Sequence, residues 1–174
     1  MEQRCCESTN FDLKQIDNMT DKLTKEQRHL CMSHIRGKDT KPEMIVRKFL
    51  FANGFRYRLH VKGLPGKPDI VLRKYRTVLF VNGCFWHGHE GCSYAKLPDQ
   101  NREFWASKIS LNKERDMREC TLLSASGWNI IVIWQCQLKS KIINETLNSL
   151  LDELKGYKQL EKNNMIAEND INYK

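Results

Sequence analysis

Two cysteines and two histidines fall within nine consecutive residues, 84–92, and share that segment with a phenylalanine and a tryptophan. Thiolate and imidazole are the ligands that zinc prefers, and a structural zinc site usually takes four of them. Cys84, His89 and Cys92 supply three ligands. A fourth must come from another part of the chain, so the segment predicts a Zn²⁺ ion that ties distant parts of the chain together.

The best candidate for the fourth ligand is Cys136, which follows an apolar segment that ends at Trp134. On spacing alone, Cys120 and Cys31 are the alternatives. A single buried cysteine or hydrogen-bonded histidine would need no metal, but four such groups around one loop favour a metal site.

The 174 residues suffice for one domain with a sizeable core. We expect a flexible leader over 1–20, a folded domain over 21–156 and a polar tail over 157–174. The formal net charge is +8, and the segment from Asp21 to His60 holds ten lysines and arginines but four acidic residues. This excess favours a polyanionic partner.

The seven cysteines are an odd number, and no apolar run has the length of a membrane span or the pattern of a signal segment. Free thiols and a metal site in a reducing cytosol fit this pattern better than a disulfide framework. We therefore expect a cytoplasmic protein.

Helical and strand patterns alternate along the chain. Thr40 and Glu43 have the spacing of a capping box, with Pro42 in the first helical turn, where proline is tolerated. We expect helices over 25–35, 40–53, 102–124 and 143–154, and strands over 55–59, 69–72, 77–81 and 129–134. This order predicts an α/β fold with helices packed around a mixed sheet.

Asp69 stands where a proline-bearing loop enters a predicted strand. A carboxylate at such a position can bind Mg²⁺, which prefers oxygen ligands and keeps several waters. An aspartate after proline also commonly caps a turn, so the position alone leaves both interpretations open.

Four motifs occur in order along the chain, at 64–69 (LPGKPD), 83–89 (GCFWHGH), 103–105 (EFW) and 114–116 (ERD). In combination they resemble the very-short-patch repair (Vsr) endonuclease family, and the match runs from about residue 25 to Cys136. The resemblance implies a restriction-endonuclease-like fold with three α/β/α layers around a central mixed sheet. It also implies an enzyme that nicks one strand of double-stranded DNA beside the thymine of a T·G mismatch, which arises when 5-methylcytosine deaminates.

By position, the resemblance makes Asp69 the catalytic, Mg²⁺-binding aspartate, with the Val81 backbone carbonyl as a further Mg²⁺ ligand. His87 matches the catalytic histidine, and Asp116 the carboxylate that orients or polarises it. Glu43 matches an acidic residue near the metal, although its capping-box role is equally physical. Without the resemblance, Asp116 would be interpreted as an exposed helix residue.

The resemblance also places Cys84, His89, Cys92 and Cys136 on the family's structural zinc ligands. It matches four further residues to side chains that the family inserts into the duplex beside the mismatch: Phe85, Trp86, Trp105 and Met32. Insertion costs a few kcal/mol of base stacking, and less at a poorly stacked mismatch. For Trp128 and Trp134, which lie in or beside a buried-strand pattern, we expect a place in the core.

The sequence departs from the family pattern at two positions. Asn82 occupies the place of a histidine that helps catalysis, and an asparagine cannot move a proton near neutral pH. Gly91 is an additional residue between His89 and Cys92, so it lengthens the zinc loop. Neither change removes Asp69 or a zinc ligand, and we expect an active nuclease.

Two other functions fit the same residues: a restriction-like or structure-specific nuclease, and a zinc-stabilised DNA-binding module without catalysis. The resemblance further implies a monomer of the bacterial cytosol that joins the nucleoid when bound to DNA. It also implies association with a DNA cytosine methyltransferase and repair proteins.

Overall fold

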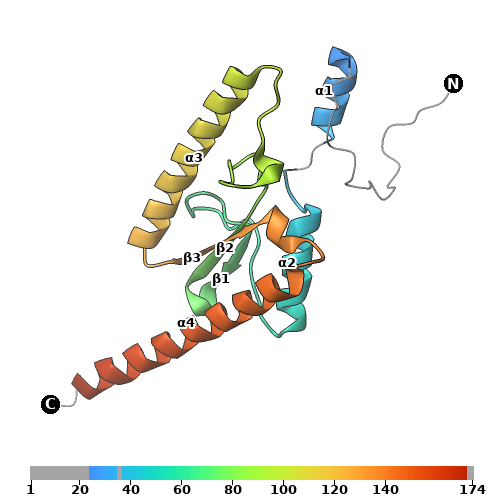
Figure 1. Ribbon diagram of the computed structural model, residues 1–174. Coiled ribbons are helices and arrows are strands. Elements are labelled where there is room, and N and C mark those ends of the chain that lie inside the picture. The colour runs from blue at the N-terminus through green and yellow to red at the C-terminus, as the bar shows by residue number, and fades with distance from the viewer. Residues whose placement is uncertain (1–23, 35–36, 172–174) are drawn as a thin grey trace. The chain divides into compact units, whose positions relative to one another are not determined.

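The computed structural model describes residues 24–34 and 37–171 of the chain (Figure 1). The chain divides into two units, Met1–Lys38 and Asp39–Lys174, and each is described by itself. Within the described residues, no helix is both long and apolar enough to cross a membrane.

The first unit contains helix α1, Lys25–Ser33. Its N-terminus is capped reciprocally: the Gln27 N–H donates to the Thr24 hydroxyl at 3.2 Å, and the Thr24 N–H donates to the Gln27 side-chain oxygen at 3.0 Å. The predicted leader over 1–20 lies outside the described residues.

The second unit is built on a three-stranded mixed sheet in the order β1-β2-β3, with β1 at Ile70–Leu72, β2 at Thr77–Asn82 and β3 at Asn129–Trp134. Strands β1 and β2 are antiparallel, whereas β2 and β3 are parallel and pair from Thr77–Asn129 to Asn82–Trp134. The mixed sheet predicted from the sequence is confirmed.

Three further helices accompany this sheet: α2 at Lys41–Ala52, α3 at Arg102–Ala125 and α4 at Ile143–Ile171. Short 3₁₀ turns occupy Arg73–Tyr75 (η1), Ser93–Ala95 (η2) and Gln135–Leu138 (η3). Helix α2 begins with the predicted capping box of Thr40 and Glu43. Helix α4 continues to Ile171, past Leu154, where the apolar periodicity of the sequence ends and a polar tail was expected to follow.

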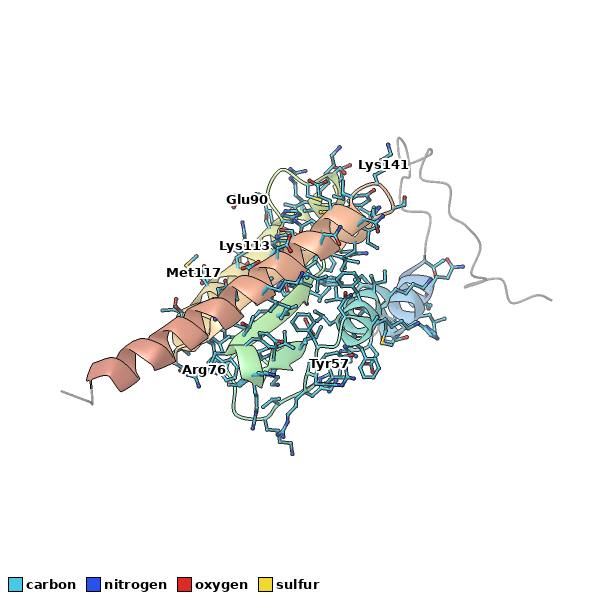
Figure 2. The ribbon with its side chains drawn as sticks, turned by 90° about the horizontal axis from the view of Figure 1, so that it is seen from below. Tyr57, Arg76, Glu90, Lys113, Met117 and Lys141 are labelled. Atoms are coloured by element: carbon cyan, nitrogen blue, oxygen red, sulfur yellow. The ribbon has the colours of Figure 1, made fainter. Side chains whose placement is uncertain are left out.

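The two faces of the sheet pack against different helices. One face, with Leu79 and Ile131, joins the main core, in which α2 contributes Val46 and Leu50 and α4 contributes leucines such as Leu154. The other face packs a smaller cluster of Val71, Val78 and Leu123 of α3. Figure 2 shows α4 in front of the strands and α3 behind them.

One predicted strand is wrong. The segment 55–59 forms only an isolated bridge, in which Arg58 and Val71 exchange two backbone hydrogen bonds of 2.9 Å. Strand β1 is three residues long, so it offers too short an edge for a longer ladder. The Phe55 and Tyr57 side chains pack against the main core instead of alternating along a sheet edge.

Candidate active site and metal centre

Asp69 directly precedes β1 and extends the pairing of β1 with β2. Its N–H donates to the Leu79 carbonyl at 3.1 Å, and its Oδ2 accepts the Val81 N–H at 2.8 Å. The backbone of β2 therefore holds one carboxylate oxygen in place and leaves Oδ1 as the oxygen that can meet a ligand.

The charged surroundings of Asp69 come from three different segments. Burial raises the pKa of Asp69, and the Glu43 carboxylate also raises it. The Val81 N–H, the Arg47 guanidinium and His87 act in the opposite direction. Two acidic and two basic side chains thus converge beside the start of β1.

Glu43 is buried and accepts hydrogen bonds from protein groups on both oxygens. Its Oε1 accepts the Thr40 hydroxyl at 2.8 Å and the Thr40 N–H at 3.4 Å, while Oε2 accepts the Asp39 N–H at 3.1 Å and Arg47 Nη2 at 2.6 Å. The capping role of Glu43 is confirmed. Its predicted place near a metal stays a prediction.

Arg47 is the cation that the sequence analysis missed. It is 3% exposed, pairs with both Asp39 and Glu43, and leaves its buried Nε without a hydrogen-bond partner. Because an unpaired buried carboxylate is costly, the ion pair with Arg47 offsets the cost of burying Glu43. The spacing of Glu43 and Arg47 on one helix face was the available signal.

His87 and Asp116 form the predicted pair. The Nδ1 atom of His87, in the loop after β2, lies 2.5 Å from Oδ2 of Asp116, in the middle of α3, and both side chains are about a quarter exposed. A carboxylate on Nδ1 fixes the tautomer and orientation of the ring and leaves Nε2 to exchange a proton with a substrate. The loop is further attached to α3 by a 2.9 Å hydrogen bond from Asn112 Nδ2 to the Trp86 carbonyl.

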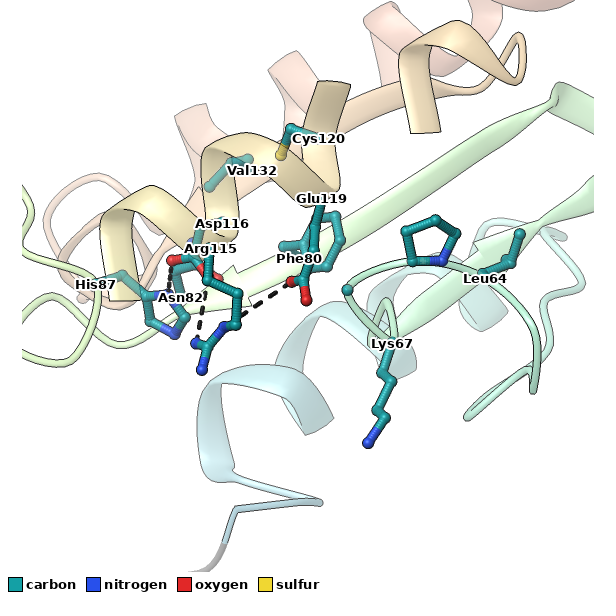
Figure 3. A pocket seen from close by; sticks show the side chains of 12 residues that line it. Leu64, Lys67, Phe80, Asn82, His87, Arg115, Asp116, Glu119, Cys120 and Val132 are labelled. Atoms are coloured by element: carbon teal, nitrogen blue, oxygen red, sulfur yellow. Dashed lines mark hydrogen bonds and ion pairs between the residues drawn. The ribbon is translucent and has the colours of Figure 1, made fainter. Parts of the chain in front are cut away.

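This pair opens onto a cavity of about 490 Å³ between α3 and the loop before β1 (Figure 3). Asn82, at the end of β2, lines the same cavity as His87. The other lining residues are Leu64, Pro65, Gly66, Lys67, Phe80, Arg115, Glu119, Cys120 and Val132.

The four predicted metal ligands meet in one cluster. One ligand atom each from Cys84, His89, Cys92 and Cys136 lies within 4.8 Å of the others, and Cys136 Sγ is 3.4 Å from His89 Nδ1. Cys120 is not part of the cluster, so Cys136 is the correct choice among the candidates that the structure describes. This donor set can bind a metal ion.

The electrostatics of the cluster fit a cation. Burial, together with the neighbouring Cys136 and Cys92, raises the pKa of Cys84 to about 12. A thiolate at this position therefore needs a positive charge beside it, which a bound metal supplies. The additional Gly91 has a φ of 67°, in the left-handed region that glycine adopts without steric cost.

Trp134 differs from expectation. Its ring stacks on the His89 imidazole, with centroids 4.1 Å apart and planes inclined by 3°. The predicted core position is therefore wrong for Trp134, because β3 ends there and the half-buried ring lies against His89 of the Cys/His cluster. Trp128 does pack against the smaller core cluster, as predicted.

The predicted aromatic residues also come together. The rings of Phe85, Trp86 and Trp105 contact one another edge to face, with centroids 5.3–5.8 Å apart. Phe104, which the sequence analysis missed, contacts Trp105 and is 58% exposed. Met32 lies on α1 in the other unit, and its side chain is outside the described part of the structure.

Comparison with known proteins agrees with the motifs. The family model "DNA mismatch endonuclease Vsr" matches residues 20–93. A type II nicking enzyme of Neisseria meningitidis serogroup A is 51% identical over 138 residues, which cover 79% of this chain and 98% of that protein. The chain belongs to the Vsr family.

Two other Vsr relatives extend the similarity. A type II nicking enzyme of Xanthomonas oryzae pv. oryzae is 47% identical over 135 residues, or 77% of this chain and 98% of its own. The DNA mismatch endonuclease Vsr of Escherichia coli is 38% identical over 137 residues, or 78% of this chain and 87% of its own. Family membership confirms the prediction of a DNA endonuclease, so the interpretation as a binding module without catalysis is set aside.

Replacing Cys84 by serine should release the metal, because a hydroxyl does not replace a thiolate ligand. We expect less than half of the wild-type metal content per full-length chain after dialysis, measured by elemental mass spectrometry, and a lower free energy of unfolding, since metal binding is coupled to folding. Cys120→Ser is the matched control and should keep both values. Wild-type metal content in Cys84→Ser would exclude this site.

Replacing Asp69 by asparagine should stabilise the Mg²⁺-free protein at pH 7. A raised pKa means that ionisation of Asp69 opposes folding above the folded-state pKa, whereas below the unfolded value of about 3.9 the carboxyl is protonated in both states. The gain should therefore shrink as the pH falls through the folded-state pKa, measured by urea denaturation. The exposed Asp99→Asn is the control, and an equal gain in Asp69→Asn at every pH would contradict the burial argument.

Proposed function

We propose that this Vsr-family enzyme nicks one strand of double-stranded DNA beside the thymine of a T·G mismatch in a Mg²⁺-dependent reaction. The observation that carries the proposal is the His87–Asp116 pair at the mouth of a cavity, near the half-buried Asp69. Hydrolysis of a phosphodiester forms one P–O bond from water and breaks another, so one oxygen loses a proton and the other gains one. A histidine held by a carboxylate suits that proton exchange.

Asp69 is the side chain suited to hold Mg²⁺, with Oδ1 as the free oxygen and the Val81 carbonyl as a backbone ligand. A bound Mg²⁺ would stabilise the negative charge that develops on the phosphate. Glu43 contributes a second negative charge nearby, but its carboxylate already accepts four protein hydrogen bonds. We therefore assign Glu43 to keeping the first turn of α2 beside Asp69.

Asn82 contributes hydrogen bonds in place of proton transfer. Its amide can donate to a phosphate oxygen or to water, and it lines the cavity together with His87. Among the described residues that line the cavity, His87 is then the only histidine, and we assign the proton exchange to it.

The cluster of Cys84, His89, Cys92 and Cys136 is best suited to a structural Zn²⁺. Two features support this metal: the Cys₃His donor set is typical of zinc, and the four protein ligands leave no open position for a substrate. His87 lies between Cys84 and His89 in the chain, so such a site would position the catalytic loop without taking part in the reaction.

The aromatic cluster of Phe85, Trp86 and Trp105 is the proposed wedge, with Met32 as a partner from the N-terminal unit. Lys108 lies within 5.9 Å of the Phe104 and Trp105 ring centroids, which adds a positive charge for the DNA backbone. A rigid aromatic group is suited to separating base pairs at a weakly stacked site.

The packing of helices on both faces of the sheet supports a restriction-endonuclease-like α/β/α arrangement. We further propose a monomer in the bacterial cytosol that acts with repair proteins on the mismatches left at the sites of a DNA cytosine methyltransferase. Several relatives are named type II nicking enzymes, so a nuclease of other specificity is the outcome to test against.

The decisive experiment compares nicking of two duplexes that differ only in one T·G mismatch, with and without Mg²⁺. We expect the thymine strand of the mismatched duplex to be nicked only when Mg²⁺ is present. For His87→Ala we expect the single-turnover rate to fall by about 10²–10⁴-fold. Asp69→Ala should abolish nicking but keep DNA binding. Equal nicking of the paired duplex would assign the enzyme another specificity.

Shortening the wedge should reduce discrimination more than affinity. For Trp86→Ala we expect a loss of about 1–3 kcal/mol in binding to the T·G duplex, because base–aromatic stacking has that magnitude. Binding to the paired duplex, measured by fluorescence anisotropy, should change much less. The exposed Phe51→Ala on α2 is the control, and equal losses of Trp86→Ala on both duplexes would contradict insertion at the mismatch.

A further inference from the structure

The cavity of about 490 Å³ beside His87 has more lining residues than the proposed proton exchange requires. Its lining follows α3 from Arg115 to Cys120 and does not include Asp69. Two of its lining residues are cations from opposite walls: Arg115 on α3 and Lys67 in the loop before β1. The proposed reaction uses neither of them.

Arg115 is held in place by two carboxylates. Its Nη2 lies 3.4 Å from Asp116 Oδ1 and its Nε 4.0 Å from Glu119 Oε2, while the side chain remains 48% exposed. These contacts restrict the guanidinium but leave Nη1, which bonds to none of the described residues, for an anion. A planar guanidinium with fixed orientation is well suited to a phosphate.

The opposite wall is equally constrained. Lys67 has a φ of 48°, which a non-glycine residue seldom adopts, and such backbone strain is concentrated at functional sites. At Gly66 a Cβ atom would come within 3.1 Å of both Glu119 Oε2 and the Phe80 ring, so the loop lies directly against the cavity wall. In Figure 3, the Arg115 and Lys67 side chains reach the same side of the cavity.

The order of residues along α3 shows where the cavity lies relative to the aromatic cluster. Trp105, in the aromatic cluster, precedes Asp116 by eleven residues, or about 16 Å of helix, and Cys120 follows Asp116 by four residues, or about 6 Å. The aromatic cluster and the cavity therefore lie on opposite sides of the His87–Asp116 pair. A strand cut beside His87 would run from one to the other.

We propose that this cavity binds a backbone phosphate of the nicked strand, on the side of the cut away from the mismatch, with Arg115 as its principal cation and Lys67 as the second. This inference rests on the proposed function for the position of the cut. Asp116 and Glu119 carry negative charge in the same cavity, and their part is to orient Arg115. The phosphate would thereby set which bond of the strand lies over His87.

The test combines a neutralised phosphate with a neutralised arginine. A series of duplexes is prepared, each with one uncharged methylphosphonate at a different position around the mismatch. The affinity of the full-length protein for each duplex is measured by fluorescence anisotropy in Mg²⁺-free buffer. In the wild type, we expect one position beyond the cut to weaken binding when neutralised. In Arg115→Gln that position should lose its effect, because the interaction is already absent.

Salt dependence supplies a second readout. One lost phosphate contact should reduce the slope of log K against log salt by about one in Arg115→Gln. Arg115→Lys keeps the charge and should retain the slope. Arg118→Gln, an exposed arginine three residues further along α3, is the matched control and should keep the wild-type methylphosphonate profile.

Two results would overturn the proposal: identical methylphosphonate profiles for wild type and Arg115→Gln, or a sensitive position on the mismatch side of the cut. Failure of the proposed function is separable. A wild type that binds DNA but nicks no T·G duplex would contradict that function, while loss of the sensitive position in Arg115→Gln would still identify a phosphate site at Arg115.

Discussion

The parallel pairing of β2 with β3 is the constraint on which both parts of the site depend. In this register Asn82 pairs with Trp134, so the two strands end at the same level. Cys84 and Cys136 each follow two residues later, and the chain therefore brings both thiols to one edge of the sheet. Asn82 and Trp134 lie at this same edge, where Asn82 lines the cavity and the Trp134 ring stacks on His89. A metal ion here would reinforce an alignment that the strand pairing already creates.

The second constraint is electrostatic. Burial makes the charges of two carboxyl groups costly, Asp69 at the start of β1 and Glu43 in the first turn of α2, while the exposed Asp39 adds a third carboxyl group beside them. Arg47 compensates by pairing with two of them from a buried position, at the cost of an unsatisfied Nε. A buried arginine of the protein thus balances part of the negative charge near the proposed Mg²⁺ position.

Features encoded in short segments could be predicted from the sequence. The capping box at Thr40, the long helix α3 and the strands β2 and β3 follow from local patterns, since turn chemistry and periodicity act within a few residues. The metal ligands followed from spacing, and the family motif selected Cys136. His87 and Asp116, 29 residues apart, were paired only by the resemblance.

Features that depend on tertiary contacts were missed or wrong. The alternating segment 55–59 had the right pattern but too short a partner strand. Trp134 had a core-like position in the sequence, but its ring stacks on His89. Arg47 and Arg115 looked like ordinary charges on helices, because the sequence does not show that Arg47 is buried or that Arg115 lines a cavity. Spacing along a helix suggests ion pairs, but burial decides their importance, and burial is a property of the whole fold.

Gly91 shows how the loop between His89 and Cys92 accommodates one additional residue. The segment joins His89 to Cys92 of the cluster, and a Cβ at Gly91 would meet no atom within 4 Å. A glycine in the left-handed conformation takes up the extra length as a local bulge. The extra residue therefore displaces no packed neighbour, and the four donor groups of the cluster still meet.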